Sequence, residues 1–310
     1  MSSTARILVL GGNGFIGRHV VTRALECGWH VAATGFALAG NPQAWAPQVT
    51  WHRVDAADRN SLETALAGAA FDYVVNCGGY IDHTPYFHGG QRVFNAHFGA
   101  AFHLPGLLDR SRLKAFVNLG SSDEYGDHPA PQAETCREAP ISPYACGKAA
   151  STQFLQMLAR TEGFPATTLR LFLTYGPGQG DRRFLPQIIR SCTAGIQFPV
   201  SRGEQLRDFC YVTDVVRAIF LALETSSAIG QVINVGSGKP ISIRCAIEHV
   251  RSFIGKGVPS YGQVAYRAGE NMSLYPDISR ARSLLGWEPQ VSFDEGIRET
   301  IRALAQEQEP

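Results

Sequence analysis

A tyrosine and a lysine stand four residues apart, at Tyr144 and Lys148, in a segment that reads as the start of a helix. On an α-helix this spacing places both side chains on one face. A tyrosine with an ordinary pKa of about 10 is a poor acid or base at neutral pH, but a neighbouring ammonium group favours its phenolate. The pair therefore predicts proton transfer by Tyr144 with help from Lys148.

A cluster of polar residues precedes this pair, at the end of a strand-like run, and reads Gly-Ser-Ser-Asp-Glu-Tyr-Gly over residues 120–126. Ser121 is the candidate for a hydroxyl that holds the reacting oxygen, and Ser122 is its rival. Asp123 is a candidate base. The alternative is a serine-rich turn with no chemical role.

Three glycines, Gly11, Gly14 and Gly17, lie between an apolar strand-like run and an apolar helical run. In this context the first permits a tight turn, the second lets the backbone approach a diphosphate, and the third lets the helix pack closely on the sheet. The free N–H groups of the helix start would bind the phosphates, whereas the alternative is a turn without chemical use. The candidate cofactor contacts in this turn are Gly11, Gly14, Phe15, Ile16, Gly17 and Arg18.

Taken together, these motifs resemble the extended short-chain dehydrogenase/reductase family, and within it the NAD-dependent epimerase/dehydratase type that acts on nucleotide sugars. The resemblance implies hydride exchange with a nicotinamide dinucleotide at a hexose carbon, commonly C4. Tyr144 would then move the hydroxyl proton, Ser121 would hold the oxygen, and both Tyr144 and Lys148 would also contact the cofactor. Further similarity covers most of the chain, at Asn95 and at residues 169–170, 175–177, 207–209, 234–238 and 285–289.

On the substrate side, Arg207 and Arg267 match family arginines that pair with the diphosphate of a nucleotide sugar, a task that suits their planar forks. A surface salt bridge is the alternative for each. Leu173 departs from the family pattern, because many relatives carry an asparagine there that touches the sugar nucleotide. Substrate geometry is therefore expected to differ from theirs.

The cofactor's ribose end shows a second departure. Gly35 stands where an NAD-selective site usually offers an acid to the ribose hydroxyls. Without that carboxylate a 2′-phosphate is tolerated, and Arg18 or Arg53 would reach it, with solvated surface residues as the alternative for both. NADP is therefore preferred to NAD. Asp55, followed by Ala56, matches the family's adenine-contacting acid, with a loop-capping aspartate as the alternative.

Several reactions share this chemistry. A 4,6-dehydratase needs an acid and a base, which relatives supply as Asp-Glu directly after the serine or threonine, whereas this chain has Ser122 and Asp123. The interpretation favoured by the whole cluster is reduction of the C4 keto group of a 4-keto-6-deoxy nucleotide sugar, with Tyr144 as proton donor. A 4-epimerase is the first rival, a 4,6-dehydratase the next, and a non-catalytic dinucleotide sensor the rival from another class.

The composition argues against nucleic acid, membranes and metal ions as partners. The chain of 310 residues carries 28 Lys and Arg against 27 Asp and Glu, so no net field draws it to nucleic acid or to an anionic membrane. Seven cysteines without a C-x-x-C pair fit neither a disulfide framework nor a zinc site, and His83 and His88 lack metal-ligand spacing and read as loop or cleft residues. We expect no metal, no signal peptide, no membrane span and a cytoplasmic location.

The chemistry must be positioned by alternating strands and helices, which predict an α/β fold with a Rossmann-type doubly wound parallel sheet and a smaller C-terminal α/β substrate lobe. The expected strands are residues 7–10, 31–34, 49–54, 73–76, 115–119, 167–171 and 231–235. The expected helices are residues 16–27, 61–67, 93–110, 148–161, 184–194, 215–223, 245–254 and 293–306.

Clustered Gly and Pro at 175–180 indicate a change of lobe. We expect residues 1–173 to bind the dinucleotide, with the strand at 231–235 returning to that domain, and residues 174–310 to bind substrate. The helices near 93–110 and 148–161 would pair two subunits in a homodimer, as in many relatives, although burial within one chain predicts the same apolar pattern.

Overall fold

The computed structural model describes residues 4–36, 47–266 and 269–306. Its centre is a seven-stranded sheet in the order β11-β6-β5-β4-β1-β2-β3, in which every pair is parallel. The strands are β1 (Arg6–Leu10), β2 (His30–Gly35), β3 (Val49–Arg53), β4 (Tyr73–Asn76), β5 (Ala115–Ser121), β6 (Ala166–Leu171) and β11 (Val232–Val235). The order reverses between β1 and β4, which is where ligands bind outside the carboxyl ends of such sheets.

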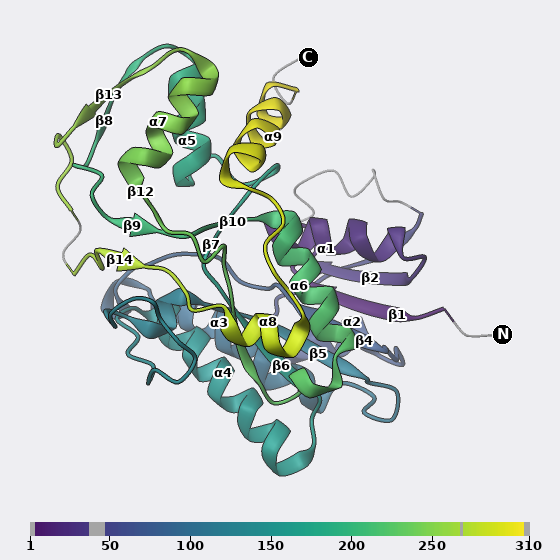
Figure 1. Cartoon of the computed structure of the whole chain (residues 1–310). Helices are drawn as coiled ribbons and strands as arrows, with labels where there is room; N and C mark the ends of the chain where they lie inside the picture. The colour runs from purple at the N-terminus through teal and green to yellow at the C-terminus, as the bar shows by residue number, and fades with distance from the viewer. Residues whose placement is uncertain (1–3, 37–46, 267–268, 307–310) are drawn as a thin grey trace.

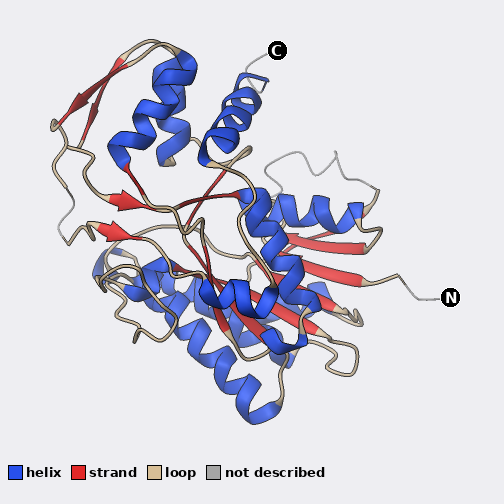
Figure 2. Ribbon diagram, viewed as in Figure 1, coloured by secondary structure: helices blue, strands red, loops and turns tan. Residues whose placement is uncertain are grey.

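Helices cover both faces of this sheet (Figures 1 and 2). Side chains alternate along β1, so that Ile7 and Val9 join the core cluster on one face while Leu8 and Leu10 join the cluster on the other. The helices of this layer are α1 (Phe15–Glu26), α2 (Arg59–Leu66), α3 (Gln91–His103), α4 (Pro143–Glu162), α6 (Val212–Glu224) and α8 (Ser279–Leu285). The predicted doubly wound α/β fold is thereby confirmed.

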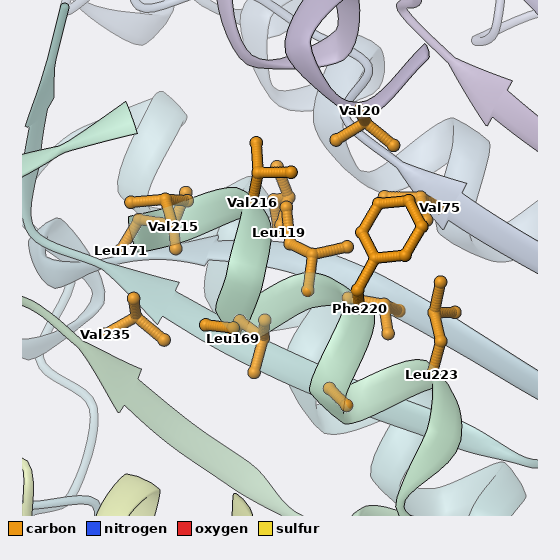
Figure 3. Packing of buried hydrophobic residues seen from close by; sticks show 14 of the residues in the cluster. Val20, Val75, Leu119, Leu169, Leu171, Val215, Val216, Phe220, Leu223 and Val235 are labelled. Carbon is orange, nitrogen blue, oxygen red and sulfur yellow. The ribbon is translucent and has the colours of Figure 1, made fainter. Parts of the chain in front are cut away.

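The core beneath α6 shows how the sheet is sealed (Figure 3). One face of α6 presents Val215, Val216, Phe220 and Leu223, all buried, to the sheet. Opposite them lie buried aliphatic side chains of four different strands, namely Val75 of β4, Leu119 of β5, Leu169 and Leu171 of β6, and Val235 of β11. The apolar face of α6 therefore packs against strands β4, β5, β6 and β11. The last of these strands comes from the second half of the chain.

A second lobe with its own core groups α5, α7 and α9 at the top of Figure 1, away from the central sheet. Its elements are β7 (Leu173–Tyr175), α5 (Phe184–Thr193), β8 (Gln197–Val200), β9 (Leu206–Arg207), β10 (Phe209–Tyr211), β12 (Ile241–Ser242), α7 (Ile243–Ile254), β13 (Val258–Tyr261), β14 (Ser273–Leu274) and α9 (Phe293–Gln306). The strands form three small sheets, β10-β7, β12-β9-β14 and β13-β8.

Two helix boundaries differ from the sequence-based expectation by more than three residues. The helix expected over 93–110 ends at His103, because Pro105 has no backbone N–H and stops the α-helical pattern. The helix expected to begin at Lys148 begins at Pro143, since the Ser142 hydroxyl accepts a hydrogen bond from the backbone N–H of Ala145 at 3.2 Å and caps it. The earlier start places Tyr144 inside α4.

The segment 285–289 ties the C-terminal part of the chain to α6. The indole N–H of the fully buried Trp287 donates to the backbone carbonyl of Asp214 at 2.9 Å. The buried Asp214 carboxylate in turn accepts from the backbone N–H groups of Gln290 and Val291, at 3.0 and 2.9 Å. Trp287, in the segment that resembles the family at residues 285–289, therefore has a structural role. No helix in the described ranges is long and apolar enough to cross a membrane.

We expect Trp287→Phe to lower the free energy of unfolding by about 1–3 kcal/mol, because it removes the indole N–H that bonds the Asp214 carbonyl and shortens a fully buried side chain. Urea denaturation followed by far-UV circular dichroism measures the change. Tyr86→Phe, at a side chain that is 53% exposed, serves as the control and should stay within about 0.5 kcal/mol. A Trp287→Phe protein as stable as that control would show that the indole N–H contributes nothing.

Candidate active site

The sheet and α4 bring Ser121, Tyr144 and Lys148 together. Ser121 is the last residue of β5, and its hydroxyl lies close enough to the Tyr144 phenol to lower the pKa of that group. One turn along α4, the Lys148 ammonium donates to the backbone carbonyl of Leu119 in β5 at 2.7 Å. All three side chains are buried. Ser121 is therefore placed beside the phenol, and its preference over Ser122 for a substrate oxygen stays a prediction.

Burial controls the electrostatics of this group. Burial raises the pKa of Tyr144, and the nearby Asp123 carboxylate raises it further. Burial also lowers the pKa of Lys148 to about 8, against the opposing effects of Glu124 and Cys77. Tyr144 thus keeps its proton at neutral pH and is suited to donate it to a carbonyl oxygen, while Lys148, still charged at that pH, would stabilise the phenolate that results.

This arrangement predicts a pH dependence. Lysine is charged below its pKa, so Lys148 loses its charge as the pH rises through about 8, and the developing phenolate of Tyr144 loses its stabilising neighbour. We expect kcat/KM for carbonyl reduction to fall as the pH rises through this region. A pH–rate profile between 6 and about 9.5 measures the effect. A profile that stays flat to its alkaline end would contradict this role of Lys148.

The glycine turn has the shape that a dinucleotide diphosphate requires. Gly11 has a φ of +67°, and a Cβ on it would lie 2.8 Å from the carbonyl oxygen of Cys77. A Cβ on Gly17 would lie 2.1 Å from the Gly11 carbonyl oxygen, so only glycine permits this close packing. Helix α1 begins at Phe15, followed by Ile16, and no side chain caps it at Gly14. Its first N–H groups fit a phosphate-binding role.

At the end of β2, a side chain takes the space in which an acid was expected. A Cβ on Gly35 would lie 2.5 Å from the side-chain oxygen of Asn13, so an aspartate or glutamate there would displace Asn13. Arg18 donates to the Asn13 backbone carbonyl at 3.4 Å. Arg53 is the strand partner of Gly35 in β3 and is exposed. Arg18 and Arg53 therefore lie near this part of the turn, and position 35 carries no carboxylate.

Asp55 follows β3 and has a visible structural task. Its side chain accepts from the backbone N–H of Ala57 at 3.0 Å, and its own N–H donates to the Ser61 hydroxyl at 3.0 Å. This is the loop-capping arrangement that sequence analysis offered as the alternative. Contact of Asp55 and Ala56 with adenine stays a prediction.

The substrate-side residues are distributed over the second lobe. Arg207 of β9 is buried and forms an ion pair with Glu270. One nitrogen of its guanidinium group therefore already contacts a carboxylate. Arg267 lies outside the described residues. Leu173, in β7, is half-buried and packs against the core of the second lobe. Pairing of either arginine with a diphosphate stays a prediction.

Sequence reasoning did not assign chemistry to two histidines that lie against Tyr144. His83 packs its ring edge-on at 5.6 Å between centroids, and its Nε2 lies 3.8 Å from Asp123 Oδ2. His97 packs from α3 at 4.8 Å and donates from Nε2 to the Tyr80 carbonyl at 2.8 Å. Burial lowers the pKa of His97 to about 3, so this ring is neutral. Local spacing carried no signal for either contact.

A buried ionic network lies next to the site. Like the two histidine contacts, this network was not predicted from the sequence. Glu124 is fully buried and accepts from the backbone N–H of Ser121 at 2.8 Å and from the Thr152 hydroxyl at 2.9 Å. Arg170 donates at 2.9 Å to the same Glu124 oxygen as Thr152, and it also pairs with Glu138. The Ser-x-x-Glu spacing of a capping box was a signal for the Ser121–Glu124 contact. This network holds the end of β5 against α4 and β6.

No group of three or more His, Cys, Asp or Glu side chains in the described part of the chain could hold a metal ion.

Comparisons with known proteins show what the chain is similar to. Residues 7–236 match the NAD dependent epimerase/dehydratase family. Among similar curated proteins, dTDP-glucose 4,6-dehydratase 1 of Escherichia coli is 26% identical over 333 residues, covering 96% of this chain and 91% of the relative. UDP-glucuronic acid decarboxylase 1 of Xenopus tropicalis is 25% identical over 316 residues, covering 98% of this chain and 73% of the relative.

Solved structures show the same similarity. The UDP-glucose 4-epimerase of Thermotoga maritima, solved with UDP-glucose, superposes with a TM-score of 0.89 at 26% identity, covering 98% of this chain and all of that one. The UDP-glucose 4-epimerase of Thermus thermophilus, solved with NAD, has a TM-score of 0.87 at 26% identity, covering 97% and 99% of the two chains. Since the family match spans well over half of its residues, this chain belongs to the NAD dependent epimerase/dehydratase family.

Proposed function

We propose that this protein is an NAD(P)-dependent oxidoreductase that reduces the C4 keto group of a nucleotide-linked 4-keto-6-deoxyhexose. The observation that carries the proposal is the buried group of Ser121, Tyr144 and Lys148, next to the glycine turn. The nucleotide-sugar substrate class is supported by the relatives, whose names specify dTDP-glucose, UDP-glucose and UDP-glucuronic acid.

In this mechanism the chain's own residues orient a carbonyl oxygen and supply a proton. Ser121 and Tyr144 bind the oxygen, and Tyr144 donates its proton as the carbonyl becomes a hydroxyl. Lys148 stabilises the resulting phenolate, and its bond to the Leu119 carbonyl holds it in place. The first turn of α1 would hold the diphosphate of a reduced nicotinamide dinucleotide, which would supply the hydride when bound.

Reduction is favoured over dehydration by the residue that follows Ser121. A 4,6-dehydratase needs an acid to protonate the departing hydroxyl, and relatives place it at the position of Ser122. Here that residue is a serine, which is not acidic at neutral pH and is only 4% exposed. Position 122 therefore offers no acid to a substrate.

The proposal is tested by offering the purified protein GDP-, CDP-, UDP- and dTDP-linked 4-keto-6-deoxyhexoses with NADPH or NADH and following cofactor oxidation. We expect oxidation with at least one of them, and a product hydroxyl at C4 by NMR. No oxidation with any of the four, under conditions where the protein binds dinucleotide, would eliminate the reductase. Dinucleotide binding without any turnover would favour a non-catalytic sensor instead.

A 4-epimerase is the second candidate, favoured by the two similar structures that are themselves UDP-glucose 4-epimerases. An epimerase would retain its dinucleotide tightly and need no added reductant. Denaturing the freshly purified protein and quantifying the released nucleotide distinguishes the two. NAD in near-stoichiometric amount, together with interconversion of C4 configurations without reductant, would establish the epimerase.

The cofactor choice is likewise open to a direct test. NAD is the nucleotide named in several similar structures, including two of 26% identity, while the preference for NADP depends on Gly35 and on the arginines nearby. The comparisons give NADP no support. Dissociation constants for NADH and NADPH, measured by nicotinamide fluorescence, decide between them: a tighter NADPH complex that loosens in Arg18→Ala would support the NADP preference.

We also propose how the chain divides its tasks. Residues 1–173 with the returning β11 would hold the dinucleotide, and the remainder after residue 173 would hold most of the substrate. Helix α6 packs against α1 and the sheet, so the chain returns to the first domain before β11. All seven thiols are free, which fits the proposed cytoplasmic location.

A homodimer through α3 and α4 is the proposed assembly. Four rings form a ladder across these helices, with centroid distances of 5.4–6.0 Å among Phe98, Phe102 and Phe154 and a Phe94–Phe98 distance of 5.8 Å. Phe102 is nevertheless 50% exposed. The other three rings are partly buried, and an apolar cluster with such an exposed edge suits an interface.

We expect light scattering to give twice the 33.7 kDa mass of the chain, and Phe102→Asp to give the monomer mass, since the substitution places a charge in the apolar face. Ile196→Asp, at an exposed apolar residue of the second lobe, is the matched control and should leave the mass unchanged. A monomeric wild-type protein would contradict the proposed assembly.

A further inference from the structure

His97, in the middle of α3, contacts both α4 and the segment that follows β4, residues 77–85, which we call the β4 loop. Its ring packs edge-on against the Tyr144 ring, with 4.8 Å between centroids. On its other side, Nε2 lies 2.8 Å from the backbone carbonyl oxygen of Tyr80. The side chain is only 4% exposed, and proton transfer from Tyr144 does not involve it.

The β4 loop begins at the sheet edge where a dinucleotide is expected to bind. It follows the point at which the strand order reverses, between β1 and β4. The backbone N–H of Cys77 donates at 3.1 Å to the carbonyl of Leu10, the last residue of β1. The Cys77 carbonyl oxygen lies 2.8 Å from the place of a Cβ on Gly11. The loop therefore starts against the glycine turn and reaches His97 three residues later, at Tyr80.

Two glycines show how closely His97 is packed between the β4 loop and α4. A Cβ on Gly79 would lie 2.2 Å from the imidazole Cε1, so the loop passes directly over the ring. A Cβ on Gly147, in α4, would lie 3.2 Å from the His97 Cβ. The Ser151 hydroxyl also donates to the His97 backbone carbonyl at 3.1 Å. A shift of this side chain would therefore change how the β4 loop sits against α4.

The hydrogen bond to Tyr80 is what a histidine adds here over an apolar ring. A carbonyl oxygen only accepts, so Nε2 carries the proton. Burial, together with the Lys148 charge, lowers the pKa of His97 to about 3, so the ring is neutral and Nδ1 has no proton. Nδ1 is buried and has no hydrogen-bond partner among the described residues, which costs free energy. A phenyl ring would avoid that cost but could not bind the Tyr80 carbonyl.

We infer that His97 is a positioning residue for carbonyl reduction, and that its donor to the Tyr80 carbonyl fixes the β4 loop relative to the Tyr144 phenol. The inference rests on the proposed function, because it needs a ketone at the phenol and a dinucleotide beside the loop. Reacting atoms must lie within about 3–3.5 Å, and a displacement of about 1 Å can cost a hundredfold in rate. The contact would keep the two sides of the site at that separation.

Substitutions at position 97 separate the donor from the ring. His97→Phe keeps an aromatic ring against Tyr144 and removes the donor. His97→Gln keeps a donor, because the glutamine Nε2 is as many bonds from Cα as the imidazole Nε2. His97→Met has the length of glutamine without its donor, and it carries the comparison if the phenylalanine variant does not fold. His103→Phe is the matched control, since His103 also lies on α3 and its Nδ1 is likewise buried and unpartnered within the described ranges.

Single-turnover kinetics measures the effect on the chemical step. Protein with bound NAD(P)H is mixed with excess nucleotide-linked 4-keto-6-deoxyhexose, and the nicotinamide absorbance is followed. We expect His97→Phe and His97→Met to lower the rate constant about tenfold to a hundredfold at unchanged amplitude, and His97→Gln to regain most of the loss. Deuterium at C4 of the nicotinamide verifies that the rate constant reports hydride transfer. His103→Phe should match the wild-type protein.

The amplitude distinguishes positioning from stability. A merely structural role would leave fewer folded molecules, which lowers the amplitude and not the rate constant. Loss of amplitude alone, in the variants that lack the donor, would therefore overturn the inference.

Hydrogen exchange of the free protein gives a second readout that needs neither cofactor nor substrate. Peptides that cover residues 77–85 should exchange faster in His97→Phe than in the wild-type protein, because the Tyr80 carbonyl loses its donor. His97→Gln should restore their protection, and peptides from α7 should not change. Equal exchange of residues 77–85 in all three proteins would contradict the proposed role.

The kinetic outcomes separate this inference from the proposed function. If the wild-type protein reduces a keto sugar and the His97→Phe rate constant falls less than about tenfold, the inference fails and the proposed function stands. The same holds if His97→Gln is no faster than His97→Phe. No hydride transfer by the wild-type protein to any of the four keto sugars would eliminate the reductase and this inference with it.

Discussion

Tyr144→Phe is expected to lower kcat for carbonyl reduction by about a hundredfold to ten-thousandfold, the usual contribution of a positioned general acid. The substitution removes the phenolic hydroxyl, and with it the proton that the C4 oxygen needs. The ring itself remains, together with its contacts to His83 and His97. Stopped-flow or steady-state measurement of NAD(P)H oxidation gives the change.

Cofactor binding is the internal control for this variant. The diphosphate would be held by the glycine turn and by the start of α1, which the substitution does not touch. The dissociation constant of the dinucleotide should therefore change little, and Tyr86→Phe, at an exposed tyrosine, should match the wild-type protein in both measurements. A Tyr144→Phe protein within tenfold of wild-type kcat would show that another group supplies the proton.

Glu124→Gln is expected to lower the free energy of unfolding by about 3–5 kcal/mol, the usual cost of removing one partner of a buried ion pair. Glu124 and Arg170 have no exposed side-chain surface, and their Oε2–Nε distance is 2.9 Å. The glutamine amide would keep the shape of the side chain but would leave the Arg170 charge with Glu138 as its remaining carboxylate partner. The urea midpoint and the melting temperature both report the loss.

The matched control is an exposed ion pair. Glu26→Gln removes the carboxylate that lies 3.2 Å from Arg23, where both side chains are more than half exposed. It should change stability by no more than about 0.5 kcal/mol, because solvent screens such pairs. A Glu124→Gln protein whose loss is no larger than that of the control would contradict the stabilising role of the network.

Much of the fold could be predicted because it depends on the local periodicity of apolar residues. The strands from β1 to β6 lie close to their expected ranges, since fully buried parallel strands show as short apolar runs. The small sheets of the second lobe were not predicted. Strands such as β9, with two residues, or β7, with three, are too short to show an alternating pattern.

The sequence by itself determined those parts of the site that lie within one element or one turn. The spacing of Tyr144 and Lys148 places them on one face of α4, and the glycines at 11, 14 and 17 already specify the turn, because both depend on backbone geometry over a few residues. Ser121 could be singled out because it ends a strand that continues into a polar turn.

Only the tertiary structure decided what surrounds the phenol. His83 and Asp123 are separated by forty residues, and Glu124 and Arg170 by forty-six, so neither contact has a local spacing. The order of the parallel sheet brings these segments together, since neighbouring strands deliver their carboxyl ends to one edge. Burial by that packing also sets the pKa of Lys148 at about 8 and holds the Tyr144 proton at neutral pH. Residue types therefore determined which chemistry is available, and packing decided which groups act together.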